Sequence, residues 1–300
     1  MVAQLVLEEY SSLISLDRKD KDEKNQLFNK QELVNHLLDI FIKENNSLKN
    51  VEIPSDYHNK RELLKDILTI RKPNPLPKVV LTELNQLLLM EAKEKGIVDI
   101  QSLSTGSEIM HTKKYSNSDK FILWKGDITR LNADVIVNAA NKYMLGCFQP
   151  GHRCIDNAIH AAAGPQLRED CNKIMQKQQE DEMTGGAKIT SAYNLPSRFI
   201  LHTVGPIVPK EAFLSVTHKQ ELANCYKSCL ELANKFNEIH TIAFCAISTG
   251  VFGFPKKDAA EIAIETVNNW LDQHPHHFKR VIFNVYTDID YNEYANVFEK

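Results

Sequence analysis

The sequence predicts an α/β protein in which a mainly parallel sheet lies between helices, preceded by a helical N-terminal extension. Short runs of β-branched and aromatic residues alternate with helical patterns from about residue 118 onward. The first 110 residues differ, because they hold only two glycines and place their apolar residues at helical spacing. We therefore expect a helical extension over residues 1–110 and an α/β domain over residues 111–300.

Three apolar faces at helical spacing predict helices in the extension. They lie within residues 33–41, 63–70 and 80–89. Prolines at positions 54, 73, 75 and 77 separate these stretches, because proline lacks a backbone donor and clashes with the preceding turn of a helix. The extension is therefore expected to be a small helical bundle.

The α/β region contains five strand-like runs, at residues 121–124, 135–137, 199–204, 241–244 and 281–285. Helical patterns separate several of them, at residues 154–163, 221–236 and 257–273. Strands that alternate with helices favour a mainly parallel sheet covered on both faces. Such sheets bind ligands at the carboxyl ends of their strands, so we expect the site in the loops that follow strands. The polar run 176–183 is expected to be a solvated surface.

Charge and cysteine content narrow the class of protein. The 36 Lys and Arg against 39 Asp and Glu give a net charge of −3, without the excess positive charge typical of a nucleic-acid binder. No apolar run approaches the roughly 20 residues that span a bilayer, and residues 1–17 lack a signal-peptide pattern. The six cysteines lack the density of a secreted disulfide scaffold. We expect a cytoplasmic protein that binds neither membranes nor nucleic acids.

Polar residues follow the first two expected strands. Gly126 permits a turn, and Asp127 offers a carboxylate that could accept a hydrogen bond from an exocyclic amine such as that of adenine. A helix cap or a turn residue is the alternative. Asn138 and Asn141 offer amide groups to a polyhydroxylated group such as ribose, with an ordinary asparagine-rich strand exit as the alternative.

A glycine-containing loop at residues 247–255 follows the strand expected at 241–244. Gly250 and Gly253 allow consecutive backbone N–H groups to converge on an anion, and the N-terminus of the next helix adds positive charge. A diphosphate suits such a loop. It is not a Walker loop, since no Gly-Lys-Ser/Thr follows. A connector without a ligand is the alternative.

Three zinc-type donors lie within eight positions of each other: Cys147, His152 and Cys154. Thiolate and imidazole are the ligands that zinc prefers, and three protein ligands with an open fourth position are typical of catalytic zinc. A structural zinc would need a fourth ligand from elsewhere, for example His160 or Cys171. Coincidence is a further alternative, because free cysteines are common in protein cores.

Together these motifs resemble the macrodomain family of ADP-ribose-binding modules. The match runs in order through residues 126–129, 137–141, 155–160, 184–190, 202–206 and 248–255. It covers about residues 118–298 and implies the macrodomain fold, a mixed, mainly parallel sheet between helices. The donors at 147, 152 and 154 stand where most macrodomains have a run of glycines, and this resembles the zinc-dependent subgroup. Members of that subgroup hydrolyse mono-ADP-ribose from proteins.

The resemblance also implies which residues bind ADP-ribose. Asp127 would read the adenine amine, with Ile128 packed beside it. Asn141 and Asp156 would face the distal ribose, next to Ile155. The diphosphate would be held by the loop of Ser248, Thr249, Gly250, Val251, Phe252, Gly253 and Phe254.

The reaction implied is zinc-dependent removal of mono-ADP-ribose from a modified protein. Zn²⁺ on Cys147, His152 and Cys154 would bring the ribose into register, while Asn141 orients the sugar. Either Asp156 or the metal would activate water. Asp156 falls in the first turn of a predicted helix, where the helix dipole stabilises a carboxylate, so we expect it to stay ionised; a simple cap is the alternative.

Two other functions use the same motifs. One is a non-catalytic ADP-ribose reader, and the other is an O-acetyl-ADP-ribose deacetylase. The expected ligands are ADP-ribose and a mono-ADP-ribosylated protein. Microbial members of the subgroup are associated with a sirtuin-type ADP-ribosyltransferase, a partner that only the resemblance implies.

Overall fold

The structure is a computed structural model that describes residues 4–14, 16, 29–109, 114–210 and 212–299. Six strands within these residues form one sheet, in the order β1-β6-β5-β2-β4-β3. The strands are β1 Phe121–Lys125, β2 Val135–Ala140, β3 Ala187–Ser191, β4 Phe199–Val204, β5 Thr241–Cys245 and β6 Arg280–Val285. All neighbours run parallel except β3 and β4. The prediction of a mixed, mainly parallel sheet is therefore confirmed.

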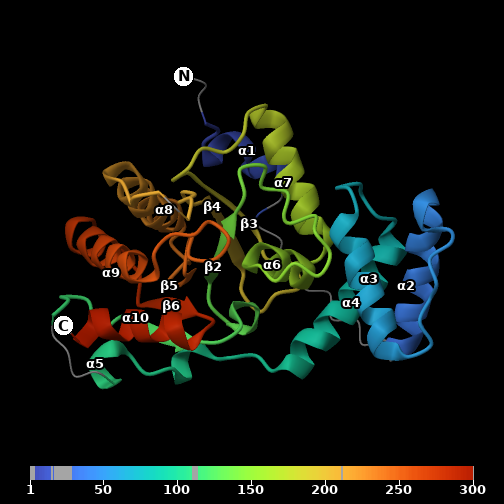
Figure 1. Ribbon diagram of the computed structural model, residues 1–300, viewed down its shortest axis with the longest axis horizontal. Coiled ribbons are helices and arrows are strands. Elements are labelled where there is room, and N and C mark those ends of the chain that lie inside the picture. The colour runs from blue at the N-terminus through green and yellow to red at the C-terminus, as the bar shows by residue number, and fades with distance from the viewer. Residues whose placement is uncertain (1–3, 15, 17–28, 110–113, 211, 300) are drawn as a thin grey trace.

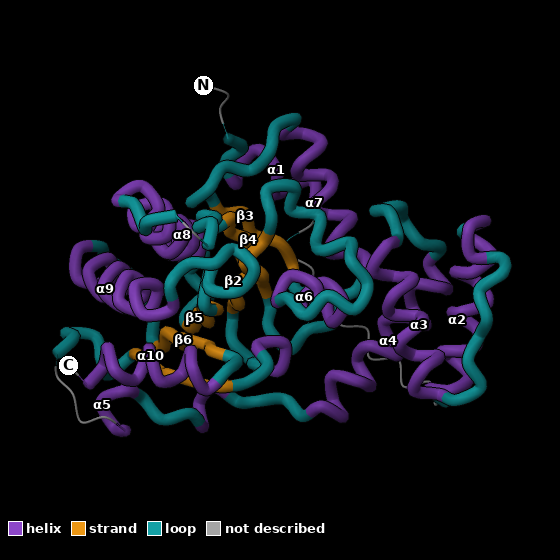
Figure 2. Tube along the Cα trace, in the orientation of Figure 1, coloured by secondary structure: helices purple, strands orange, loops and turns teal. Residues whose placement is uncertain are grey.

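Helices cover the sheet on both sides. The helices of the α/β domain are α5 Gly106–Ile109, α6 Ile155–Ala163, α7 Pro165–Gln178, α8 Val216–Asn234, α9 Lys256–Gln273 and α10 Asp288–Glu299. Figure 2 shows α8 and α9 on one side of the strands, with α6 and α7 on the other. One large hydrophobic core lies between these layers and contains the apolar residues of β1, β2, β4, β5 and β6.

The five strand-like runs and the three helical patterns of the domain coincide with elements of the structure. Helix α8 begins five residues before the predicted start at 221, because the Ser215 side chain accepts from His218 N and forms a capping box. Helix α6 ends at Gly164, which has a φ of 96°, and α7 begins directly at Pro165. A glycine followed by a proline allows this abrupt change of direction.

The expectation that residues 176–183 form a solvated surface is wrong in part. Gln178 and Glu182 are buried, and the Glu182 carboxylate lies 2.8 Å from the buried Nζ of Lys188. Lys188 belongs to β3, the strand that the sequence pattern missed. The charged Lys188 interrupts the apolar pattern by which the strand would be predicted, and its partner Glu182 lies in a loop.

The extension contains α2 Lys30–Glu44, α3 Tyr57–Ile70 and α4 Lys78–Lys95, which confirm the three predicted helices. They share a separate hydrophobic cluster that includes Leu37, Leu64 and Leu84. Figure 1 shows this bundle beside α6, with which α3 and α4 are in contact. The predicted boundary between residues 110 and 111 lies outside the described residues.

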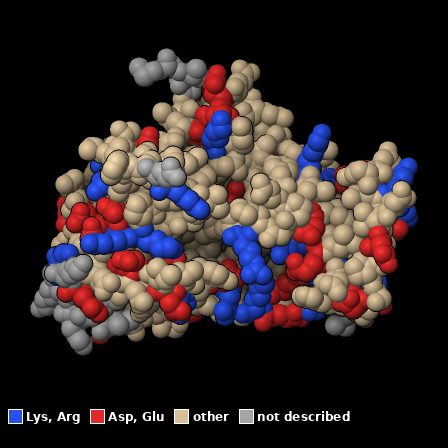
Figure 3. All heavy atoms as spheres, in the orientation of Figure 1, with Lys and Arg blue, Asp and Glu red and all other residues tan. Residues whose placement is uncertain are grey.

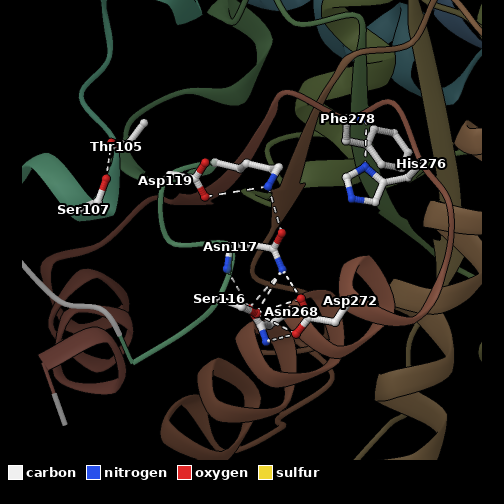
Figure 4. Close-up of polar contacts among 10 residues, drawn as sticks. Thr105, Ser107, Ser116, Asn117, Asp119, Asn268, Asp272, His276 and Phe278 are labelled. Carbon is white, nitrogen blue, oxygen red and sulfur yellow. Dashed lines mark hydrogen bonds and ion pairs between the residues drawn. The ribbon is translucent and has the colours of Figure 1, made fainter.

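Two further segments join the N-terminal region to the sheet. Helix α1, Leu7–Ile14, packs on α7 and β3, and the buried Tyr10 hydroxyl accepts from the backbone N of Ile189 at 2.9 Å. Before β1, Asn117 Nδ2 donates to Asp272 Oδ1 of α9 at 2.8 Å (Figure 4). No helix in the described ranges is long and apolar enough to cross a membrane.

Candidate active site

The carboxyl ends of β2 and β5 lie side by side, because these strands are neighbours in the sheet. The loop with the three zinc-type donors follows β2, and the glycine-containing loop follows β5. Figure 3 shows the surface hollowed near the middle of this face, close to the carboxyl end of β2 in Figure 1. The candidate residues therefore gather where parallel sheets place their ligand sites.

Asp156 is the central carboxylate of the site. It lies in the first turn of α6 and is only 5% exposed. Asn138 Nδ2 donates to Oδ1 at 2.8 Å, and Asn141 Nδ2 donates to Oδ2 at 3.3 Å. Asn141 also donates to the backbone oxygen of Gly146 at 3.0 Å, which ties the loop after β2 to the carboxylate.

Burial acts on Asp156 against the expected effect of the helix dipole. Loss of solvent raises the pKa of this carboxyl to about 6, although the hydrogen bonds from Asn138 and Asn141 and the charge of Arg168 oppose the rise. The expectation that the helix dipole keeps this carboxyl ionised left out desolvation, which acts in the opposite direction. A carboxylate buried to this degree loses more from desolvation than one helix end returns.

Two buried histidines, His202 and His160, lie next to Asn138 and Asp156. His202 Nδ1 lies 3.2 Å from Asn138 Nδ2, and burial lowers the pKa of His202 to about 3, so the neutral ring can accept from the amide. His160 Nε2 lies 3.5 Å from Asp156 Oδ1, and burial holds the pKa of His160 well below its usual value. The carboxylate is thus held by neutral amides and faces a neutral imidazole.

The three zinc-type donors converge at the edge of this site. One ligand atom from each of Cys147, His152 and Cys154 lies within 4.8 Å of the others. Cys147 Sγ is 3.3 Å from His152 Nδ1, and Cys154 Sγ accepts from Asn157 N at 3.4 Å. The set consists of two sulfurs and one imidazole nitrogen, which suits zinc.

No fourth Cys, His, Asp or Glu among the described residues completes this cluster. His160 and Cys171, the two alternative ligands, group instead with His202 in the buried interior. His160 also packs against the loop that carries the three donors, since a Cβ at Gly146 would lie 2.8 Å from its ring.

The loop after β5 exposes a row of backbone donors. Phe254 N donates to the Ser248 carbonyl at 3.0 Å and closes the loop, while Gly253 has a φ of 71°. The backbone N–H groups of Gly250, Val251 and Phe252 make no hydrogen bond to any part of the chain that the structure describes. Such a row of free N–H groups can hold an anion.

Asp127 takes the capping role that was expected as the alternative to adenine binding. Its Oδ1 accepts from Thr129 N at 3.0 Å and from Thr129 Oγ1 at 2.7 Å, so the residue caps a short 3-10 helix at Ile128–Arg130. Its Oδ2 has no hydrogen-bond partner within the described ranges and stays free for a ligand. Ile128 is buried beside it, and Ile155 at the start of α6 is half-buried.

Two contributors to the site, Gly205 and Arg168, are absent from the sequence-based candidates. A third, Asn138, was expected only to offer its amide to a sugar, whereas it makes the shortest hydrogen bond to Asp156. Gly205 packs closely against the loop after β5, because a Cβ there would lie 2.0 Å from Ser248 Oγ. Arg168 comes from α7, far along the chain, and no local pattern marks it.

The fold and the site define a class: an α/β protein whose ligand site lies at the carboxyl edge of a six-stranded mixed sheet. Residues 137–263 match the macro domain family. A protein-ADP-ribose hydrolase of Treponema medium is 43% identical over 256 residues, which are 85% of this chain and 93% of that protein. One from Staphylococcus aureus strain MSSA476 is 39% identical over 265 residues, covering 88% and 94%. The chain belongs to the macro domain family, as its motifs predicted.

Solved structures agree with this assignment. The Oceanobacillus iheyensis macrodomain with ADP has a TM-score of 0.52 and 38% identity, and covers 59% of this chain and 88% of its own. The Trypanosoma brucei macrodomain in complex with ADP-ribose has a TM-score of 0.57 and 27% identity, and covers 77% and 94%. A probable bifunctional ADP-ribose hydrolase/ADP-ribosyltransferase of Fusarium oxysporum is 41% identical over 246 residues, 80% of this chain but 41% of that protein.

Proposed function

We propose that this protein is a zinc-dependent hydrolase that removes mono-ADP-ribose from modified proteins and releases ADP-ribose. The observation that carries the proposal is the buried Asp156 carboxylate, held by two amides, two positions along the chain from a zinc-type donor, Cys154. A module that only binds ADP-ribose needs neither feature. The relatives named protein-ADP-ribose hydrolase, matched over most of both chains, support the same activity.

The bound nucleotide would extend across the carboxyl edge of the sheet. Asp127 Oδ2 would accept from the adenine amine, and the free N–H groups of Gly250, Val251 and Phe252 would donate to the diphosphate. The distal ribose would then lie against Asn141. These remote contacts supply the binding energy that holds the reacting bond in register.

The chain's own groups provide the proton transfer. Asp156 would accept a proton from the attacking water, while Asn138 and Asn141 keep both carboxylate oxygens in position. Asn141 is fixed in turn by its bond to the Gly146 carbonyl. The water oxygen would bond to the ribose carbon as the bond from that carbon to the protein side chain breaks. The side chain would leave with the electron pair of that bond, and Asp156 would then release its proton to the side chain or to solvent.

The donor set of Cys147, His152 and Cys154 fits zinc in atom type and in spacing, and these three residues would hold the ion. When bound, zinc supplies a Lewis acid that can polarise a ribose hydroxyl or the leaving group. Asn157 supports the set through its backbone donation to Cys154 Sγ and its side-chain donation to the His152 carbonyl at 3.0 Å.

The cell must supply the modified protein, so an ADP-ribosyltransferase, by resemblance one of the sirtuin type, is the proposed partner. The fungal relative whose name joins hydrolase and transferase supports this pairing. We also propose a cytoplasmic location, supported by the six free cysteines among the described residues.

Incubation with a mono-ADP-ribosylated protein tests the proposal. We expect free ADP-ribose to appear, to stop after zinc is chelated, and to resume when zinc is added back. Tight binding of ADP-ribose without any release would identify a reader instead. Faster turnover of O-acetyl-ADP-ribose than of the modified protein, measured in competition, would identify a deacetylase.

A further inference from the structure

A second cavity lies between the helical extension and α6. The empty space between its walls, together with its open mouth, is about 540 Å³. One wall is formed by α3 and the segment that follows it, and the opposite wall by α6 and the start of α7. On α6 the lining residues Asn157, His160, Ala161 and Gly164 are spaced as one face of the helix. This face is distinct from the carboxyl edge of the sheet, where the nucleotide would bind.

The lining carries strong positive charge and no acidic residue. Its basic residues are Arg61, Lys65, Arg71, Lys72 and Arg168. Glutamates outside the lining neutralise two of them: Glu91 pairs with Arg61, and Glu44 pairs with Arg71. Of the remaining three, Lys65 and Lys72 leave an excess of positive charge at the cavity.

The two lysines at this cavity have little compensation. Lys65 Nζ lies 3.4 Å from the exposed Glu62, a weak surface contact. Lys72 has no ion-pair partner anywhere in the described residues. Arg168 differs from the two lysines, because its N–H groups donate to backbone carbonyls and its charge acts on the nearby Asp156 carboxylate. An anion would therefore find two weakly compensated cations here, Lys65 and Lys72.

A buried polar atom without a partner marks the same cavity. Arg61 Nη1 is buried and makes no hydrogen bond within the described part of the chain, even though its Nε and Nη2 bind Glu91. His160 also borders the cavity, but its Nε2 lies 3.5 Å from Asp156 Oδ1, so this ring belongs to the active site. Buried donors without acceptors are rare in folded proteins and are commonly explained by a bound group.

We propose that this cavity binds a small phosphate-type oxyanion, either free phosphate or the phosphate of a small metabolite. Lys65 and Lys72 would supply positive charge, and Arg61 Nη1 would supply a charge-assisted hydrogen bond. The cavity wall also includes Asn157 and Arg168, which donate to carbonyls of the loop that carries Cys147 and His152. The oxyanion would thus lie against the residues that support that loop.

Calorimetric titration of the full chain tests this site. Inorganic phosphate is added at constant ionic strength, with ADP-ribose present so that the diphosphate loop is occupied. We expect one phosphate site in the wild type, weakened about tenfold or more in the Lys65→Ala/Lys72→Ala variant, since two cations that contact the anion are lost. A parallel titration with ribose 5-phosphate decides the source, because tighter binding than phosphate identifies a metabolite.

The matched control is Lys49→Ala/Lys60→Ala, which removes the same charge from the same extension. Lys49 is exposed, Lys60 donates to Asn35 Oδ1, and neither lines the cavity. The control should bind phosphate as the wild type does. Absence of phosphate binding in the wild type would overturn the proposal, and so would equal affinities in the two double variants. Neither result bears on the hydrolase activity, which is measured separately.

Discussion

The guanidinium carbon of Arg168 lies 4.3 Å from the ring centroid of Phe148, a residue of the loop that carries the zinc-type donors. The same guanidinium donates to the carbonyls of Leu145 and Cys147 in that loop. It also donates to three carbonyls within residues 68–71, at the end of α3. One side chain of α7 therefore joins the helical extension to the loop beside the active site.

Replacement of Arg168 with lysine should loosen both attachments. A lysine amine cannot reproduce the planar fork of five N–H donors, so some buried carbonyls would lose their partner. We expect unfolding free energy to fall by about 1–3 kcal/mol and bound zinc to be lost more readily, as measured by urea unfolding and metal analysis. Arg153→Lys, on the exposed side of the same loop, is the control. Unchanged zinc retention in Arg168→Lys would show that the loop does not depend on this residue.

Asp156→Asn should separate binding from catalysis. The amide keeps the size of the carboxylate but cannot accept a proton from water, so we expect release of ADP-ribose to slow by about 100- to 10,000-fold. Calorimetry should show that ADP-ribose still binds, because Asp127 and the loop after β5 are unchanged. Turnover close to that of the wild type would exclude Asp156 as the base.

Cys154→Ser should abolish hydrolysis while the fold remains intact. Cys154 is the N-cap of α6, where its sulfur accepts from Asn157 N, and serine is a favourable residue at that position. The variant therefore keeps the cap but loses a sulfur ligand for zinc. Added zinc should restore activity to chelated wild type and not to the variant. A metal-free Cys154→Ser preparation with full activity would refute the role of the ion.

Gly205→Ala should weaken nucleotide binding, although we propose no contact between Gly205 and the nucleotide. The new methyl would lie 2.0 Å from Ser248 Oγ and 2.9 Å from Ile247 Cγ2, so the side chains of Ser248 and Ile247 must shift, and we expect the loop after β5 to shift with them. We expect the affinity for ADP-ribose to fall about tenfold or more, since the loop donors would leave their positions. Gly106→Ala, where a Cβ meets only ordinary contacts at 3.6 Å, should bind normally. Equal affinities in the two variants would contradict the inference that Gly205 keeps the loop after β5 in its binding position.

Glu182→Gln should destabilise the protein through Lys188. Both side chains of this ion pair are nearly fully buried, so the variant leaves a buried cation without its counter-charge. We expect the free energy of unfolding to fall by about 3–5 kcal/mol. The neighbouring exposed pair of Asp181 and Lys142 provides the contrast, because Asp181→Asn should change stability by less than about 1 kcal/mol. Chemical denaturation of both variants measures the difference.

The sequence by itself determined the elements and the positions of the local motifs. Runs such as 135–137 are apolar and β-branched over a few residues, so a strand followed by Asn138 and Asn141 can be predicted from short-range pattern. The donor triad of Cys147, His152 and Cys154 is likewise local, because one short loop is enough to bring the three side chains together. Local spacing is enough when the interacting groups are few positions apart.

Only the tertiary structure decided which distant groups act together. Asn138 meets Asp156 from a different element, and Arg168 reaches residues 68–71 about a hundred positions earlier. Burial then changes how these groups ionise and pair. It raises the pKa of Asp156, and it places Lys188 and Glu182 in the interior, where each needs the other as a counter-charge. Desolvation and non-local hydrogen bonds arise only when the chain is packed, and for this reason no pattern of neighbouring residues reveals them.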